Sequence, residues 1–173
     1  MARTPRRPQV VDKDLGWKEL LRRARAVRNS YVRVGVLGDD SKGAERPEGS
    51  DLTVAEIAAI NEFGTDDGHV PSRPAFRHTF DAKRAELVEL GKKLMRAYID
   101  GKMPIDRALG ILGSTLASEI KKTITQWPLP GFPPPNAPST VRAKQRDKPG
   151  MVRTLVDTGR MVGAITWSVV VRE

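Results

Sequence analysis

The sequence predicts an α+β domain in which a small antiparallel sheet packs against a long helix and a second helix. Three observations lead to this class. Two short β-branched runs lie far apart in the chain, at 31–37 and 164–171. Two long stretches between them repeat apolar residues every three or four positions, as amphipathic helices do. A basic start and six prolines within 127–138 add an extended N-terminal arm and an extended Pro-rich arm.

The composition is that of one basic domain without disulfides. The chain has 173 residues, enough for a single domain with its own core. Its 30 Lys and Arg against 21 Asp and Glu give a formal charge of +9, which favours nucleic acid, an anionic surface or an acidic protein as partner. Cysteine is absent, which excludes disulfides and thiolate metal sites. We expect a soluble, unsecreted protein, because no run approaches about 18 apolar residues and no apolar segment follows the basic start.

Residues 1–16 are expected to form a basic arm, and residues 17–173 a single domain. The arm carries Arg3, Arg6 and Arg7 and is too polar to fold by itself. Beyond it, apolar side chains recur at helical spacing opposite arginines, which predicts an amphipathic helix. The apolar positions are Trp17, Leu20, Leu21, Ala24 and Val27. This helix is either a solvated basic surface or a surface that docks on DNA or on an acidic neighbour.

The first β-branched run, 31–37, is expected to be a strand. Gly35 within it indicates close backbone approach or a bulge. Residues 38–52 contain almost nothing apolar and predict an exposed loop. The glycines, lysine and serine of this loop do not follow the order of a phosphate-binding loop, so nucleotide binding is not predicted.

A short helix is expected after this loop. Thr53 and Glu56 have the spacing of a capping box, in which each side chain bonds the backbone of the other. Apolar residues follow through Ile60, and Gly64 is expected to end the helix.

We interpret residues 61–76 as a rigid joint, inside the fold or between subunits. Two prolines fix the backbone, and Ser72 can cap a long helix that begins within a residue or two of Arg73. The joint presents Asn61, Glu62 and Phe63 beside Arg73. We predict an ion pair between Glu62 and Arg73.

The long helix is expected to reach about Ile99 and to bury one stripe, which includes Phe76 and Phe80. A second long helix should begin near Ile105. Its two glycines, Gly110 and Gly113, either permit a close crossing against a neighbour or are simply tolerated.

Residues 127–150 are expected to run as a Pro-rich extended segment that includes a short basic turn. Trp127 and Phe132 are its expected anchors. The segment is either a crossover packed on its own subunit or a strap between subunits. A brief helix at 160–163 should then lead to the closing strand, 164–171, which most simply pairs antiparallel with the first strand.

No catalytic arrangement is evident in the sequence. The only imidazoles are His69 and His78, and His69 lies near Asp66 and Asp67. These groups could hold a metal or poise a base, but no nucleophile or third ligand accompanies them. We therefore expect no enzyme, no cofactor and no metal, and a small hydrolase is the least favoured alternative.

Several segments taken together resemble the tail-completion or neck proteins of long-tailed bacteriophages. The segments are VRVGVLG, NEFGT, PSRP, NAPSTVRAK and LVDTG, in this order within 31–171. The family includes minor tail components of lambda-like phages and related prophage morphogenesis proteins. The resemblance implies an α+β subunit of a ring that lies between head connector and tail tube and has no catalytic residues.

The resemblance and the basic charge lead to the same expected function, a structural ring around a DNA channel. The partners would be other copies of the chain, six by analogy with tail tubes or twelve to match a connector. Its neighbours would be the connector or stopper, the tail tube or tail terminator, and genomic DNA. No membrane partner is expected. The ring would lie in the neck or tail of the virion and be assembled in the cytoplasm of a bacterial host.

The residues expected at interfaces belong to the arm, the joint and the Pro-rich segment. They are Arg3, Arg6, Arg7, Asn61, Glu62, Phe63, Arg73, Trp127 and Phe132. The alternative function is a free nucleic-acid-binding protein that uses the basic N-terminal helix. Its DNA affinity would fall steeply with salt, whereas ring formation would tolerate salt.

Overall fold

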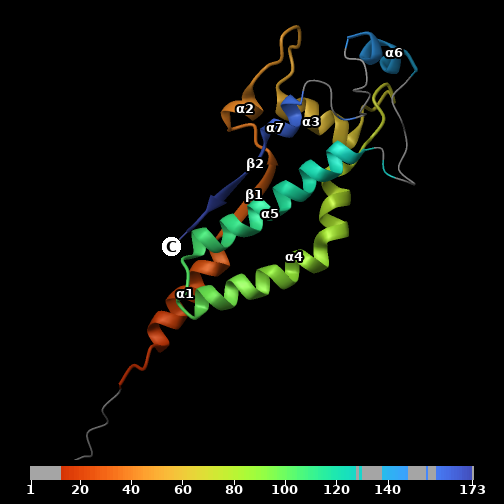
Figure 1. The fold of residues 1–173 in the computed structure, drawn as a ribbon. Coiled ribbons are helices and arrows are strands. Elements are labelled where there is room, and N and C mark those ends of the chain that lie inside the picture. The colour runs from red at the N-terminus through yellow and green to blue at the C-terminus, as the bar shows by residue number, and fades with distance from the viewer. Residues whose placement is uncertain (1–12, 128, 130–137, 148–154, 156–158, 173) are drawn as a thin grey trace, which may run out of the picture.

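The computed structural model describes residues 13–127, 129, 138–147, 155 and 159–172. It confirms the predicted α+β class, with a two-stranded antiparallel sheet and two long helices (Figure 1). The elements are α1 (Trp17–Asn29), β1 (Tyr31–Val36), α2 (Ser41–Ala44), α3 (Val54–Phe63), α4 (Ala75–Ile99), α5 (Ile105–Gln126), α6 (Pro138–Asp147), α7 (Arg160–Ala164) and β2 (Ile165–Val170). Within the described residues, no helix is both long and apolar enough to cross a membrane.

The two strands pair as the sequence predicts. Tyr31 faces Val170 and Val36 faces Ile165, with an unbroken register between them. Gly35 therefore does not form a bulge. Its φ of 148° lies in the region that side-chain-bearing residues rarely adopt, and this conformation explains the glycine.

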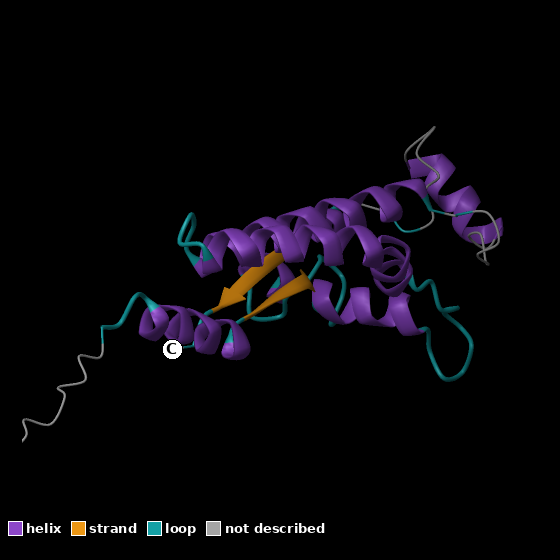
Figure 2. Ribbon diagram, turned by 90° about the horizontal axis from the view of Figure 1, so that it is seen from below, coloured by secondary structure: helices purple, strands orange, loops and turns teal. Residues whose placement is uncertain are grey.

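The long helices lie on one side of the sheet, with α5 directly against it (Figure 2). A β-carbon at Gly113 would lie 2.7 Å from Val32 Cγ2 and 2.9 Å from Trp167 Cβ. Only glycine permits this approach, so of the two alternatives the close crossing holds at Gly113, with the sheet as the neighbour. At Gly110 the nearest atom to such a β-carbon is Trp167 Nε1 at 4.0 Å, so this glycine is merely tolerated.

Two hydrophobic clusters hold the helices to the sheet. The main cluster joins α5 to β2 and to the start of α4, and Trp127 belongs to it. Its buried members are Ala75, Ala117, Ile120, Ile124, Trp127, Leu155 and Ile165. The second cluster, Tyr98 with Ile105 and Leu109, lies toward the other end of α5, where Val27 of α1 packs against it.

The buried stripe of α4 differs from the prediction at Phe80. This ring is 48% exposed, while the neighbouring Thr79 is buried. The Thr79 hydroxyl donates to the Ala75 carbonyl oxygen at 2.7 Å and lies 2.7 Å from the Thr123 hydroxyl of α5. These bonds satisfy a polar group that would otherwise be costly to bury.

Two segments expected to lack regular structure contain helices. In the loop 38–52, the Asp40 carboxylate accepts a bond from the Lys42 backbone N–H at 3.1 Å and begins α2. In the segment 127–150, the basic turn is the ten-residue helix α6. Pro138 suits the first position of α6, and the Arg, Ala, Lys and Gln that follow favour a helix.

Candidate functional site

The candidate site is the elbow, residues 53–77, in which α3 and α4 are joined by a short loop. Its first part follows the prediction. Thr53 N–H donates to Glu56 Oε2 at 2.7 Å and Glu56 N–H donates to Thr53 Oγ1 at 3.2 Å, which confirms the capping box. The backbone bond from Thr53 holds the pKa of the Glu56 carboxyl below its ordinary value. Gly64 ends α3 with a φ of 81°.

The Glu62 carboxylate connects the two helices of the elbow. Its oxygens accept from the backbone N–H groups of Phe76 at 2.9 Å and Arg77 at 3.0 Å, in the first turn of α4. Pro74 precedes α4 and offers no side-chain cap. Glu62, near the end of α3, therefore caps the N-terminus of α4. A negative charge is stabilising at a helix N-terminus.

The predicted ion pair between Glu62 and Arg73 is wrong within the subunit. Glu62 is only 6% exposed and pairs with the Arg77 guanidinium at 3.2 Å. Ser72 does not cap α4 either, because its hydroxyl donates to the Glu62 carbonyl oxygen at 2.8 Å. The sequence could not reveal this arrangement, since the carboxylate and the amides it caps are more than a dozen positions apart.

Further hydrogen bonds hold the end of α3 and the loop of the elbow. Arg73 N–H donates to the Asn61 carbonyl oxygen at 2.7 Å. The Asn61 amide in turn donates to the Ile57 carbonyl oxygen at 2.8 Å. Arg73 is buried, and this burial lowers the pKa of its guanidinium. These hydrogen bonds, all within the subunit, hold the loop of the elbow to the end of α3.

Within the loop of the elbow, the Asp67 carboxylate bonds to groups of the loop itself. Asp67 Oδ1 accepts from the Thr65 hydroxyl at 2.6 Å and from the His69 backbone N–H at 2.9 Å. These bonds, the Thr65 bond foremost, lower the pKa of Asp67. No group of three His, Asp or Glu side chains in the described part of the chain is placed to hold a metal.

The predicted interface residues separate into exposed and buried groups. Phe63 is 68% exposed, and the Arg77 guanidinium lies 5.2 Å from its ring centroid. Glu62, Arg73 and Trp127 are buried within the subunit. The Trp127 ring meets His78 edge to face, with ring centroids 6.5 Å apart, so at this residue the segment packs on its own subunit. Arg3, Arg6, Arg7 and Phe132 lie outside the described residues.

A second surface, on α1, is more exposed than the sequence indicated. No residue of α1 is buried, and the N-terminal half of the helix exposes large apolar side chains. Leu15, just before the helix, is 87% exposed and Trp17 is 65% exposed. The amphipathic pattern predicted the helix and its apolar positions, including Trp17, but left open whether this surface is solvated or docks on a partner.

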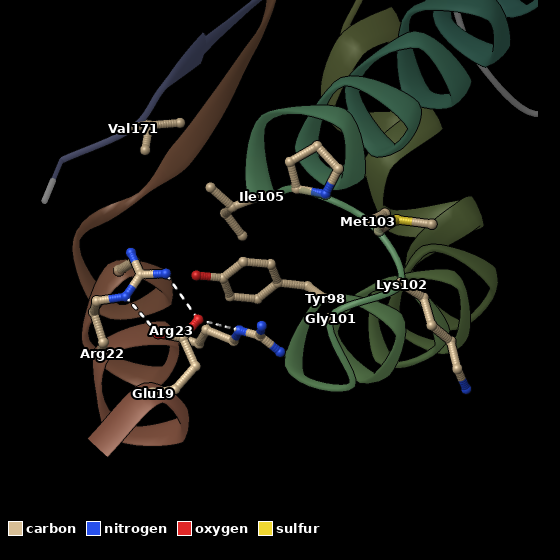
Figure 3. A pocket seen from close by; sticks show the side chains of 11 residues that line it. Glu19, Arg22, Arg23, Tyr98, Gly101, Lys102, Met103, Ile105 and Val171 are labelled. Atoms are coloured by element: carbon tan, nitrogen blue, oxygen red, sulfur yellow. Dashed lines mark hydrogen bonds and ion pairs between the residues drawn. The ribbon is translucent and has the colours of Figure 1, made fainter. Parts of the chain in front are cut away.

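The other half of α1 is attached to the end of α4. Arg23 donates to the Ile99 carbonyl oxygen at 2.8 Å, and Glu19 accepts from Arg22 and Arg23, each at 2.8 Å. These bonds, led by that from Arg22, lower the pKa of Glu19 to about 2. A cleft of about 420 Å³ separates α1 from the turn between α4 and α5, and Tyr98 points into it (Figure 3).

No family model, curated protein or solved structure matches the chain. Function is therefore inferred from the two surfaces described above and from the resemblance of the sequence segments.

Proposed function

We propose that the chain is a structural subunit of a ring in the neck of a long-tailed bacteriophage. The ring completes the tail and joins it to the head connector around the DNA channel. The observation that carries the proposal is the exposed apolar surface on α1. The resemblance of the sequence segments supplies the place of the ring in the particle.

An exposed surface of this kind favours assembly. Leu15, Trp17 and Leu20 are large side chains that the subunit leaves in water. Burial of one such side chain contributes about 1.5–3 kcal/mol. Contiguous exposed apolar patches of this type mark interaction sites on soluble proteins. Contact with a neighbouring subunit would recover that free energy.

The elbow supports a mechanical role. The Glu62 carboxylate is fully engaged by the first turn of α4 and by Arg77, so it is not free to act as a base. The neighbouring Asp67 is engaged by its own loop. Such bonds hold α3 and α4 at a fixed angle, which suits a subunit whose surfaces must meet neighbours repeatedly in one geometry.

The partners follow from the proposed position. Copies of the chain form the ring, six by analogy with tail tubes, and the connector or stopper and the tail tube or terminator contact its two faces. The surplus of basic residues attracts the phosphates of DNA in the channel without base reading. Assembly takes place in the cytoplasm of the bacterial host, and the ring remains in the virion.

Native mass spectrometry and electron microscopy of the purified chain test the proposal. We expect closed rings of six copies, or twelve, that persist at high salt. DNA affinity should be weak. A chain that stays monomeric at every concentration and binds DNA with a steep salt dependence would contradict the ring and favour the free nucleic-acid-binding alternative.

A further inference from the structure

We infer that the subunits pack head to tail, with the α1 surface of one copy on the acidic end of the next. The α1 surface comprises Leu15, Trp17, Lys18, Leu20 and Arg25. The acidic end comprises residues 39–67, which include α2, α3 and their connecting loops. The inference rests on the proposed ring and specifies the two surfaces that form it.

The acidic end departs from the charge of the rest of the protein. Within a chain of formal charge +9, residues 39–67 hold nine Asp and Glu against two Lys and Arg. The carboxylates of Glu48, Asp51 and Asp66 are exposed and take part in no hydrogen bond or ion pair in the described part of the chain. They are therefore available to a partner.

The same segment, 39–67, also exposes apolar side chains. Leu52 and Phe63 are both exposed large hydrophobic residues of this end. A partner for such a surface must be basic and must also bring apolar side chains.

The α1 surface has this chemistry. The helix carries five Lys and Arg against one Glu. Lys18 and Arg25 are seven positions apart, so they lie along one line of the helix, beside the exposed Trp17. Basic and apolar groups here complement the acidic and apolar groups of residues 39–67.

The two surfaces lie at opposite ends of the subunit. Both views place α1 at one end of the molecule and α3 with its loops at the other (Figures 1 and 2). A contact between two α1 helices would bring like charges together, whereas a contact between α1 and the acidic end brings opposite charges together. A contact between two different surfaces repeats from copy to copy and closes into a ring when the rotation is suitable.

A charge exchange between two variants tests the inference. Lys18→Glu with Arg25→Glu puts glutamates on the α1 surface, opposite the acidic end. Glu48→Lys with Asp51→Lys puts two lysines on the acidic end, opposite the basic α1 surface, and leaves seven Asp and Glu against four Lys and Arg within residues 39–67. Each variant alone should assemble at least about tenfold more weakly than the native chain, because like charges then face each other. An equimolar mixture should form rings again, since the variants can alternate with opposite charges at every contact.

The control is Arg84→Glu with Lys93→Glu, two exposed positions on α4 that belong to neither surface. This control should form rings as the native chain does. Substitution to glutamine at the same two pairs of sites provides a milder set that removes charge without reversing it, and each glutamine pair should weaken assembly less than the corresponding reversal. Native mass spectrometry reports the mass of each ring, and therefore how many copies of each variant a mixed ring contains.

The outcomes separate the inference from the proposed function. A native chain that forms no ring contradicts the proposed function itself. A native ring that survives Glu48→Lys with Asp51→Lys overturns the head-to-tail inference, because an α1 to α1 contact would not depend on these residues. Two defective variants that remain separate when mixed overturn it as well.

Discussion

Glu62 shows how a single side chain fixes the angle between two helices. Its carboxylate accepts two backbone N–H groups from α4 while its own backbone belongs to α3. The glutamate is buried, so no water replaces these bonds if the charge is lost. The residue predicted at an interface makes its contacts inside the subunit, where it joins α3 to α4.

Glu62→Gln should therefore destabilise the subunit. The substitution keeps the size of the side chain but removes the charge that two amides and Arg77 require. Loss of charge-assisted bonds at a buried site costs about 1–3 kcal/mol. Urea unfolding measures the change, with Asp66→Asn as an exposed control that should stay near the native value. A Glu62→Gln chain as stable as that control would contradict the capping role.

Glu19 provides a second prediction at this scale, on pH. Arg22 and then Arg23 lower its pKa to about 2, from an ordinary value of 4.5. Because the folded pKa is the lower one, the contribution of Glu19 to α1 is present above about pH 4.5 and is lost as the pH falls toward 2. NMR titration of the Glu19 carboxyl should give a midpoint near 2 in the native chain. Arg22→Gln should move the midpoint up toward 4.5, and an unchanged midpoint would contradict this assignment.

At the level of elements, helix α5 is positioned by one glycine. Gly113 lets the helix lie against Val32 and Trp167, whereas a β-carbon at Gly110, one turn earlier, would make only an ordinary contact at 4.0 Å. The two glycines therefore provide a matched pair, with the same residue type, helix and neighbouring strand.

Gly113→Ala should cost about 1–3 kcal/mol of stability, because the new methyl group would overlap the sheet. Gly110→Ala should instead stabilise the subunit by about 0.5–1 kcal/mol through helix propensity. Thermal unfolding of the two variants measures both effects. Equal effects of the two substitutions would contradict the close approach at Gly113.

The sequence was sufficient for the elements that local chemistry determines. Thr53 and Glu56 predicted the start of α3, apolar spacing predicted α4 and α5, and β-branched runs predicted both strands. It failed where distant groups decide the outcome. Glu62 contacts its partners only after the chain turns back. Thr79, and not Phe80, is buried, because the Thr123 hydroxyl on α5 bonds to the Thr79 hydroxyl.

The sequence predicted only part of the candidate site. The segment 61–76 was predicted to be a joint, and the structure shows a compact turn held by its own hydrogen bonds. The buried positions of Arg73 and Trp127 depend on tertiary packing that no local pattern reports. The exposure of Trp17 depends on which face of α1 the subunit covers, and this is decided by Arg23 and Val27.

The whole molecule is elongated, with the basic helix α1 at one end and the acidic residues 39–67 toward the other, where the basic helix α6 also lies (Figure 1). Both α1 and residues 39–67 expose apolar side chains. This asymmetry fits a subunit that meets its neighbours in one direction around a ring. Opposite charges would speed the encounter and exclude wrong orientations, while burial of apolar groups would hold the contact at high salt. We propose that the exposed apolar surface on α1 serves assembly.

Comparison of the masses of the native chain and of Trp17→Ser with Leu20→Ser, at equal concentration, tests this claim most directly. Both side chains are exposed in the subunit, so unfolding by urea should show little change in the stability of the fold. We predict rings of six or twelve copies for the native chain and single subunits for the variant. Native rings that the double substitution leaves intact would contradict the claim.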